Sequence, residues 1–462
     1  MMQFTSKNKL WLLGLLSTII YLVNLRVGDL LAQIGILNAA PHPIVSFLIQ
    51  IVPLSVFYVL ALWLVGRPEE KVSKHLVPVI FLFALLFRLP LITQSPVLSS
   101  DLYRYLWDGK VQVSGLNPYL FPPEDGHLSF LRDEEIYPNI NRKESRTVYP
   151  AGAQLLFWSI NWLGLDTPIG FKAAALGADA LTLLLLLLLL KEVGLPQSHL
   201  LIYAWNPLII YELFSSGHLE SFMLPPLLAF TYFFLRGQLL RAGAALGLAT
   251  AIKLVPALLL ITIPPGKRLK VTLPFVLVLA LSYSVYAGAG EKILGFLPSY
   301  FSDPYEIFNP GLIQAALLWV AKSFSFPSPW IRYLLLPFLL AVLTAIARRP
   351  YASPEDLIEK IYITLSAYLL LIYPAFHPWY LCSLIPLLCL VPSRAWIYLS
   401  LALPLSYLKY LAPTGTMPAW ITLAQFAPLY ALLATEYVGM KPLMERRYQW
   451  HLGTQTPSST TL

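Results

Sequence analysis

Residues 168–190 read PIGFKAAALGADALTLLLLLLLL, and this run carries only two charged side chains, Lys172 and Asp179. A helix of about 20 apolar residues spans the hydrocarbon core of a bilayer. Similar runs recur from Leu10 to Tyr437 in a chain of 462 residues that is 57% hydrophobic and 12% charged. The mean hydropathy of +0.65 excludes a water-soluble fold. Because lipid offers no partners to backbone polar groups, the pattern predicts an all-α polytopic membrane protein with about 12–14 transmembrane helices.

The chain is predicted to form one transmembrane domain, residues 1–440, followed by a tail at 441–462. The end of this tail is rich in Ser and Thr, which is typical of a disordered segment. The predicted spans lie near residues 10–24, 44–66, 75–93, 168–190, 199–213, 219–236, 239–253, 254–265, 270–288, 330–347, 358–374, 379–392, 395–411 and 418–437. Two more apolar runs, 150–163 and 310–322, are expected to lie at the membrane interface or to re-enter it without crossing.

One long polar segment, residues 94–149, interrupts the apolar runs and contains 8 of the 24 acidic residues. A connection of this length in a compact protein is usually functional. With the amino terminus in the cytoplasm, three crossings place the segment outside, so 94–163 is predicted to be an external loop with juxtamembrane helices. Arg and Lys then concentrate in the cytoplasmic turns, for example at Arg236 and Arg241, as the positive-inside rule requires.

The net charge of +8 does not indicate nucleic-acid binding. Cytoplasmic loops of membrane proteins accumulate Lys and Arg, and this bias alone makes such chains basic. The chain also lacks a basic stripe with interleaved aromatic residues, which nucleic-acid binding would require. We therefore expect membrane lipid, and no nucleic acid, among the partners.

The densest cluster of polar residues opens the long segment, at SSDLYRYLWDGK, residues 99–110. Ser99 or Ser100 can cap a helix that starts near Asp101, and Gly115 with Asn117-Pro118 would end it. Helical spacing then places Asp101, Arg104, Tyr105 and Asp108 on one face. The alternative interpretation is a solvated interface helix whose charges pair only with one another.

This segment, with Gly115-Leu-Asn-Pro-Tyr119 and Tyr149-Pro150 beside Gln154, resembles the first external loop of bacterial GT-C glycosyltransferases. The similarity is to glycosyltransferase family 87 and the polyprenol-phosphate-mannose-dependent mannosyltransferases. Three later motifs resemble the same group: Gly217-His218-Leu219-Glu220, Ala251-Ile-Lys253-Leu-Val-Pro256 and His377-Pro-Trp379-Tyr380-Leu381. Two positions depart from the group's pattern, since Ala151 stands where Pro is expected and Glu220 where Asp is expected.

The resemblance implies a GT-C fold, a polyprenyl-phosphate-linked sugar donor and an inverting transfer on the outer membrane face. It places Asp101 at the centre of the chemistry. The acceptor would be a glycan or glycolipid, and mannose is the favoured hexose. We expect an integral protein of the bacterial inner (plasma) membrane with its active site on the extracytoplasmic face.

Single-displacement glycosyl transfer needs one base to accept the proton of the acceptor hydroxyl, and Asp101 is the predicted base. A departing phosphate needs cations or hydrogen-bond donors, for which Arg104, Lys253 and His377 are candidates. Asp108 would hold Arg104 or the acceptor. The other predicted substrate-binding residues are Tyr103, Tyr105, Trp107, Asn117, Tyr149, Gln154, His218, Glu220, Trp379 and Tyr380. No metal or cofactor is predicted, because Asp101 and Asp108 would lie about 10 Å apart along a helix.

Two other functions compete with transfer. A secondary transporter would use Lys253, His218 and His377 as ionisable groups at the membrane midplane. A non-catalytic scaffold of the cell envelope would not depend on Asp101. Each polar residue also has a purely structural explanation: Lys253 can extend its amine to the interface, and His377 can belong to an aromatic interface belt.

Overall fold

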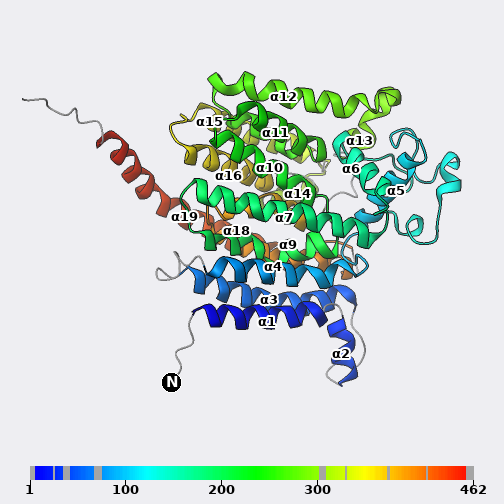
Figure 1. Ribbon diagram of the computed structural model, residues 1–462, viewed down its shortest axis with the longest axis horizontal. Coiled ribbons are helices and arrows are strands. Elements are labelled where there is room, and N and C mark those ends of the chain that lie inside the picture. The colour runs from blue at the N-terminus through cyan, green and yellow to red at the C-terminus, as the bar shows by residue number, and fades with distance from the viewer. Residues whose placement is uncertain are drawn as a thin grey trace, which may run out of the picture.

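The computed structural model describes residues 6–23, 26–34, 42–66, 75–300, 308–327, 330–371, 375–412 and 415–453. All regular elements in these residues are helical, apart from one isolated bridge between Phe308 and Ala375. The long helices run roughly side by side, and one end of the bundle carries the segment around α5 and α6 (Figure 1). The prediction of an all-α polytopic membrane fold is thereby confirmed.

The α-helices are α1 (Ser6–Val23), α2 (Val27–Gln33), α3 (Pro43–Val65), α4 (Leu76–Ile92), α5 (Asp101–Val113), α6 (Ala151–Trp162), α7 (Pro168–Glu192), α8 (Leu201–Ala204), α9 (Pro207–Ile210), α10 (Glu220–Leu235), α11 (Leu239–Ile252), α12 (Pro265–Ser284), α13 (Leu297–Tyr300), α14 (Leu312–Ser323), α15 (Trp330–Arg348), α16 (Pro354–Leu371), α17 (Ile385–Leu388), α18 (Arg394–Ala402) and α19 (Ala419–Gly453). The 3-10 segments are η2 (Gly126–Leu131), η3 (Tyr137–Asn139), η4 (Gln197–Leu200), η6 (Val255–Thr262), η7 (Ala287–Leu294), η9 (Pro378–Ser383) and η10 (Leu403–Leu411), and η5 (Tyr211–Ser215) is a π-helix.

Two helices in the described part of the chain, α3 and α7, are individually long and apolar enough to cross a membrane. A third candidate is α12 together with residues 287–299, which are bent from one another by 108°. Other predicted spans are broken. The run 199–213 is built from η4, α8, α9 and η5, the run 254–265 is mostly the 3-10 segment η6, and 379–392 contains η9 and α17.

Proline explains these breaks, because it lacks the backbone N–H that continues an α-helix. Pro207 opens α9, Pro256 lies at the start of η6, and Pro378 opens η9. Irregular backbone is tolerated at membrane depth only where protein surrounds it. Residues 200–220 meet this condition, because every one of them is buried. The expectation of simple α-helical spans was therefore wrong at the centre of the molecule.

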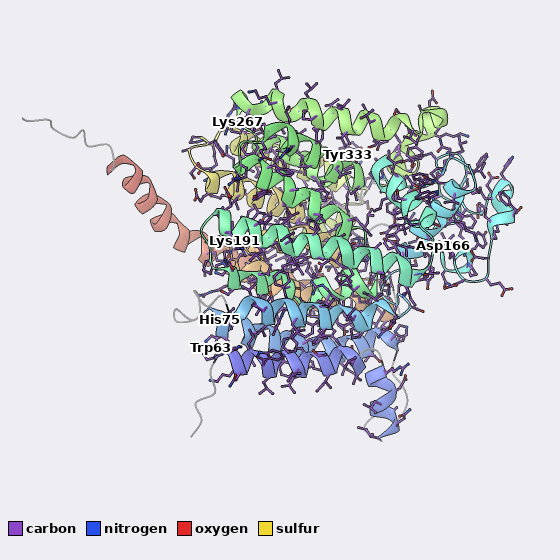
Figure 2. The ribbon with its side chains drawn as sticks, viewed as in Figure 1. Trp63, His75, Asp166, Lys191, Lys267 and Tyr333 are labelled. Atoms are coloured by element: carbon purple, nitrogen blue, oxygen red, sulfur yellow. The ribbon has the colours of Figure 1, made fainter. Side chains whose placement is uncertain are left out.

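The two ends of the bundle differ in charge. Trp63, His75, Lys191 and Lys267 lie toward the end opposite Asp166 (Figure 2). At that end Arg236 pairs with Glu192 at 3.3 Å. The other end carries the acidic segment 94–149, so the basic turns and the acidic loop lie at opposite ends, as the sequence predicts.

The two apolar runs that were expected not to cross are the short helices α6 and α14. Helix α6 packs on α5, where Gly109 permits close approach, because a Cβ at that position would meet the Phe157 carbonyl. The start of α14 contacts the end of α16 through Gln314, whose Nε2 donates to Leu370 O at 2.7 Å. Its last turn packs against α15, since Ala321 shares a small buried cluster with Ile331 and Leu335. With 12 residues, α14 is shorter than the helices that are long enough to cross a membrane.

The predicted tail at 441–462 begins as helix, because α19 continues to Gly453. Residues 454–462 lie outside the described residues. In the interior, a buried ion pair joins α4 to α7: Arg88 Nε lies 2.7 Å from Asp179 Oδ2, and both side chains are about 1% exposed. Tyr203 donates to the other carboxylate oxygen at 2.5 Å. This cluster fixes the irregular segment around α8 against two long helices.

Candidate active site

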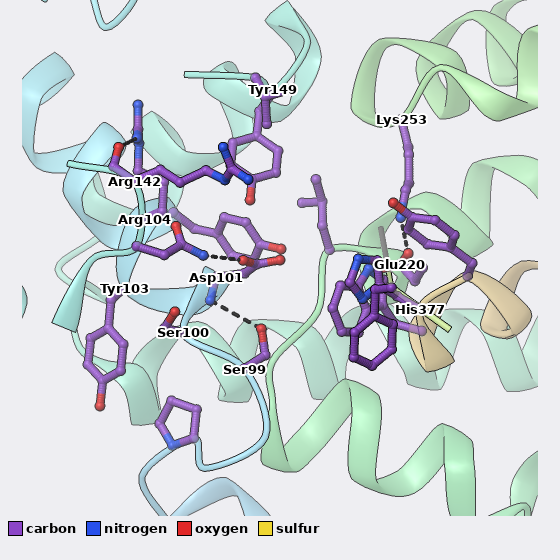
Figure 3. A pocket seen from close by; sticks show the side chains of 18 of the residues that line it. Ser99, Ser100, Asp101, Tyr103, Arg104, Arg142, Tyr149, Glu220, Lys253 and His377 are labelled. Carbon is purple, nitrogen blue, oxygen red and sulfur yellow. Dashed lines mark hydrogen bonds and ion pairs between the residues drawn. The ribbon is translucent and has the colours of Figure 1, made fainter. Parts of the chain in front are cut away.

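A cavity of about 780 Å³ lies at the loop end of the bundle, between α5, the loop before α6, the start of α10 and the breaks after α11 and α16. Asp101 lies between Arg104 and Tyr149 on one side and Lys253, Glu220 and His377 on the other (Figure 3). The lining residues that carry charge are Asp101, Glu220, Arg104, Arg142, Arg146, Lys253 and Lys409. Five cations against two carboxylates make the cavity attractive to an anionic ligand.

Asp101 is the first residue of α5, as the sequence predicts. Ser100 occupies the N-cap position, but its side chain makes no capping hydrogen bond. The Asp101 N–H donates instead to Ser99 Oγ at 3.3 Å. The carboxylate accepts a hydrogen bond from Asn141 Nδ2 at 2.8 Å. Its side chain is 22% exposed, so a ligand can reach it.

Arg104 and Asp108 form a buried pair on the same face of α5. Arg104 Nε lies 2.8 Å from Asp108 Oδ1, and Arg104 Nη1 donates to Ser145 O at 3.1 Å. Gln154 Nε2 donates to Asp108 Oδ2 at 2.9 Å and to Thr147 Oγ1 at 2.7 Å. Asp108 thus holds Arg104, and Gln154 ties α6 to α5 and to the loop. The sequence alternative of a solvated helix fails, since both members of the pair are less than 6% exposed.

Lys253 lies where α11 ends and the backbone becomes extended, with φ −148° and ψ 133°. Its Nζ pairs with Glu220 at the start of α10 and lies 4.8 Å from the centre of the Tyr380 ring. The Lys253 side chain is 26% exposed and that of Glu220 is 2% exposed. The lysine therefore has a carboxylate partner and still faces the cavity.

A series of stacked rings forms one wall of the cavity. His377 stacks on Phe308 at 4.5 Å and on Trp379 at 4.2 Å, and Trp379 also stacks on His218 at 4.1 Å. Phe308 in turn stacks on Tyr410 at 5.7 Å. The two predicted histidines thus stack on the same ring, Trp379, although 158 positions lie between them in the sequence; His377 lines the cavity and His218 is buried behind it.

His218 is fully buried behind Asp101. Its Nδ1 lies 3.9 Å from Asp101 Oδ2, and its Nε2 lies 3.3 Å from Glu212 Oε2. Glu212 was not predicted from the sequence, because it lies in the apolar run that was assigned as a plain span. A carboxylate inside such a run is itself a signal of function, and it could have identified this residue.

The structure brings most of the predicted site residues together. The cavity lining contains Asp101, Tyr103, Arg104, Tyr105, Tyr149, Glu220, Lys253, His377, Trp379 and Tyr380. The phenol of Tyr103 points away from Asp101 (Figure 3).

The remaining predicted residues, Trp107, Asp108, Asn117, Gln154 and His218, are not part of the lining. Trp107 packs instead on Tyr137 at 5.4 Å, which stabilises the loop. Asn117 accepts a hydrogen bond from the Tyr119 N–H at 3.1 Å and so shapes a turn.

Several lining residues escaped prediction. These are Asn139, Asn141, Arg142, Ser145, Arg146, Phe296, Phe308, Tyr368, Lys409 and Tyr410, among others. Arg142 has a φ of +47°, which is uncommon outside glycine, and its guanidinium lies 5.2 Å from the Phe296 ring centre. Many of them come from loops, where no periodicity marks them, whereas Tyr368 lies in α16 and Lys409 and Tyr410 lie in η10.

The two tyrosines beside Asp101 are hydrogen-bond donors rather than bases. Burial, and then the neighbouring Tyr149 and Asp101, raise the pKa of Tyr105 well above its ordinary value. Burial, followed by the negative charge of Asp101, does the same to the pKa of Tyr149. Both phenols therefore keep their protons across the physiological pH range. Among the described residues, no group of three His, Cys, Asp or Glu side chains is arranged to hold a metal ion.

The fold and the cavity define a polytopic membrane protein with one charged site at the end of a helical bundle. A family model described as "Alpha-(1->6)-mannopyranosyltransferase, N-terminal domain" matches residues 12–264, and the chain therefore belongs to this MptA_B family. The protein is accordingly a mannosyltransferase, and the resemblance to glycosyltransferase family 87 is confirmed. No curated protein and no solved structure matches the chain. The family favours the transferase over the secondary transporter and the scaffold.

Proposed function

We propose that this enzyme transfers mannose from a polyprenyl-phosphate donor to a hydroxyl of a glycan or glycolipid by single displacement. The observation that carries the proposal is the position of one accessible carboxylate, Asp101, in a cavity with an excess of cations. One base and one anion site are what this reaction requires.

In the proposed reaction, Asp101 accepts the proton of the acceptor hydroxyl. The oxygen of that hydroxyl forms the new bond to C1 of mannose, and the bond from C1 to the phosphate oxygen breaks. The phosphate leaves with the electron pair and gains negative charge. Lys253 and Arg104 face the cavity from opposite sides and stabilise this charge, and His377 contributes a ring nitrogen on the side of Lys253.

The family name adds a stereochemical constraint, because it specifies an α-(1->6) linkage. A single displacement inverts the configuration at C1. An α product therefore requires a β-linked mannosyl phosphate as donor.

The cavity also has an apolar part, which suits a lipid-linked donor. Ile44, Val97, Leu98 and Leu254 line it beside the charged residues. A polyprenyl chain can leave the site along such side chains and enter the bilayer without burying polar groups in lipid.

The charges at the two ends support an extracytoplasmic location for the proposed site. The end with Lys191, Arg236 and Lys267 is the cytoplasmic end under the positive-inside rule. The cavity lies at the opposite end, with the acidic loop. We therefore propose that the active site faces the outside of the bacterial plasma membrane.

The test incubates membranes containing the full-length protein with labelled polyprenyl-phosphate β-mannose and a mannoside acceptor. Asp101→Asn should lower kcat by about 10²- to 10⁴-fold, the usual contribution of a general base. Asp166→Asn is the matched control, because it makes the same substitution at the same end of the molecule but outside the cavity. If Asp101→Asn inserts normally and keeps full transfer, Asp101 is not the base.

A further inference from the structure

Glu212, His218 and Asp101 form a line of side chains that leads from the protein interior to the cavity. Both the Glu212 and the His218 side chains are 0% exposed, whereas Asp101 is 22% exposed. The imidazole lies between the two carboxylates, 3.3 Å from Glu212 Oε2 and 3.9 Å from Asp101 Oδ2. An imidazole with a buried carboxylate behind it is the arrangement that orients a histidine for proton transfer.

The backbone around these residues is specialised. Glu212 belongs to the π-helix η5, and π-helical turns occur frequently at functional sites. Gly217 has a φ of +74°, and a Cβ there would lie 3.1 Å from the Leu102 side chain of α5. Only glycine suits this turn, and the turn delivers His218 directly behind the start of α5.

Neighbouring side chains hold both groups in place. Tyr407 donates a hydrogen bond to Glu212 Oε1 at 2.8 Å, which leaves Oε2 toward His218. The imidazole stacks on Trp379 with an interplanar angle of 22°. Its ring plane and the carboxylate behind it are therefore fixed, and Nδ1 is directed at Asp101.

We propose that Glu212 and His218 act as a positioning and proton-relay pair for Asp101. This role rests on the proposed function of Asp101 as the base. The negative charge of Glu212 Oε2, 3.3 Å from Nε2, favours the tautomer that carries its proton on Nε2, and this tautomer keeps the Nδ1 lone pair toward Asp101. When Asp101 has taken the acceptor proton, Nδ1 takes that proton from the carboxylic acid, and after the products leave it returns through Asp101, which is 22% exposed, to water in the cavity, so that His218 is neutral again. Glu212 stabilises the resulting imidazolium, and Asp101 returns to the carboxylate needed for the next cycle.

The charged and titratable groups around His218 come from several elements. Asp101 belongs to α5, Glu212 to η5 and Tyr407 to η10. His377 lies beyond Trp379 and stacks on the same ring, and Glu220, two residues after His218, pairs with Lys253. Glu212 is the nearest carboxylate to the imidazole in this set, so loss of its charge should have the largest effect on protonation of His218.

The experiment measures kcat, KM and the pH dependence of kcat for full-length protein with polyprenyl-phosphate mannose. Glu212→Gln should lower kcat by about 10- to 100-fold, less than the loss of the base itself, and leave KM for the donor within about threefold. Without the negative charge, the imidazolium is less favoured, so the acidic limb of the kcat profile should move to lower pH by about one unit or more. Glu212→Asp should restore part of the rate.

Two comparisons separate the relay from a structural role. Tyr407→Phe removes a hydrogen bond from the same carboxylate but keeps its charge, so it should leave the acidic limb in place. Because the pair acts as a unit, the double variant Glu212→Gln, His218→Gln should be no slower than His218→Gln alone. Additive losses, or a loss of rate with an unmoved pH profile, would overturn the proposal.

The failure of this proposal is distinguishable from failure of the proposed function. If Asp101→Asn is inactive and Glu212→Gln behaves as the wild type, the relay is refuted and the base assignment stands. If Asp101→Asn is fully active, the base assignment and the relay both fall.

Discussion

Replacing the Lys253–Glu220 pair one member at a time should separate folding from catalysis. Glu220 is 2% exposed and Lys253 is 26% exposed, so the two single substitutions are not equivalent. Lys253→Met leaves a buried carboxylate without its partner, which costs about 3–5 kcal/mol of stability. Glu220→Gln leaves an amine that water can reach and should therefore cost less.

The double variant Glu220→Gln, Lys253→Met removes both charges and should regain most of the lost stability. Its activity should not return. If Lys253 donates to the leaving phosphate, its loss removes a charged hydrogen bond of about 1.5–3 kcal/mol, or about 10- to 150-fold in kcat.

The assay pairs thermal unfolding in detergent with transfer from the labelled donor. If Lys253→Met is no less stable than Glu220→Gln, the unpaired buried carboxylate carries no cost and the stability prediction is wrong. If the double variant is stable and transfers mannose at the wild-type rate, Lys253 has no role at the phosphate and the activity prediction is wrong.

Two further predictions concern stability. Asp179→Asn leaves Arg88 buried without a counter-charge and should destabilise the protein by about 3–5 kcal/mol, measured as a lower unfolding temperature; an unchanged temperature would contradict the inferred pairing of α4 with α7. In the loop, burial would raise the pKa of Asp133, but the ion pair with Lys110 and two backbone N–H groups outweigh it and lower that pKa. The ionised Asp133 carboxylate therefore stabilises the folded protein at pH values above its unfolded pKa of about 3.9. This stabilisation is lost as the pH falls through the lower pKa of the folded state. Asp133→Asn should accelerate proteolysis of the loop at pH 7, and the difference from the wild type should shrink below about pH 4; an equal difference at both pH values would exclude this cause.

Local sequence signals predicted α5, the helix that carries the proposed base. The polar start at Asp101 and the turn residues after Val113 defined α5, and helical spacing placed Arg104 near Asp108. These features depend on neighbours in sequence, so a single chain reveals them. The separation of the acidic loop from the basic turns at opposite ends of the bundle was also predicted, because it requires only the positions of charged residues and apolar runs along the chain.

The irregular centre could not be predicted in the same way. Hydropathy shows that residues 199–213 are apolar, but it does not distinguish a continuous α-helix from a chain that is broken at Pro207. Here the segment before the break begins with the 3-10 turn η4, and the segment after it ends in the π-helix η5. The role of Glu212 depends on this irregularity, because a π-helix places it against His218. Loop residues such as Arg142 depend on tertiary contacts, and no repeat in the sequence marks them.

The two walls of the cavity come from separate parts of the chain. Residues 99–105 and 139–150 build one wall, and the breaks after α11 and α16 build the other. Exchange of the external loop between related enzymes, with Asp101 and Arg104 kept, would therefore change the loop wall while leaving Lys253 and His377 in place. Such modular exchange is a route by which one donor chemistry could serve different sugar chains.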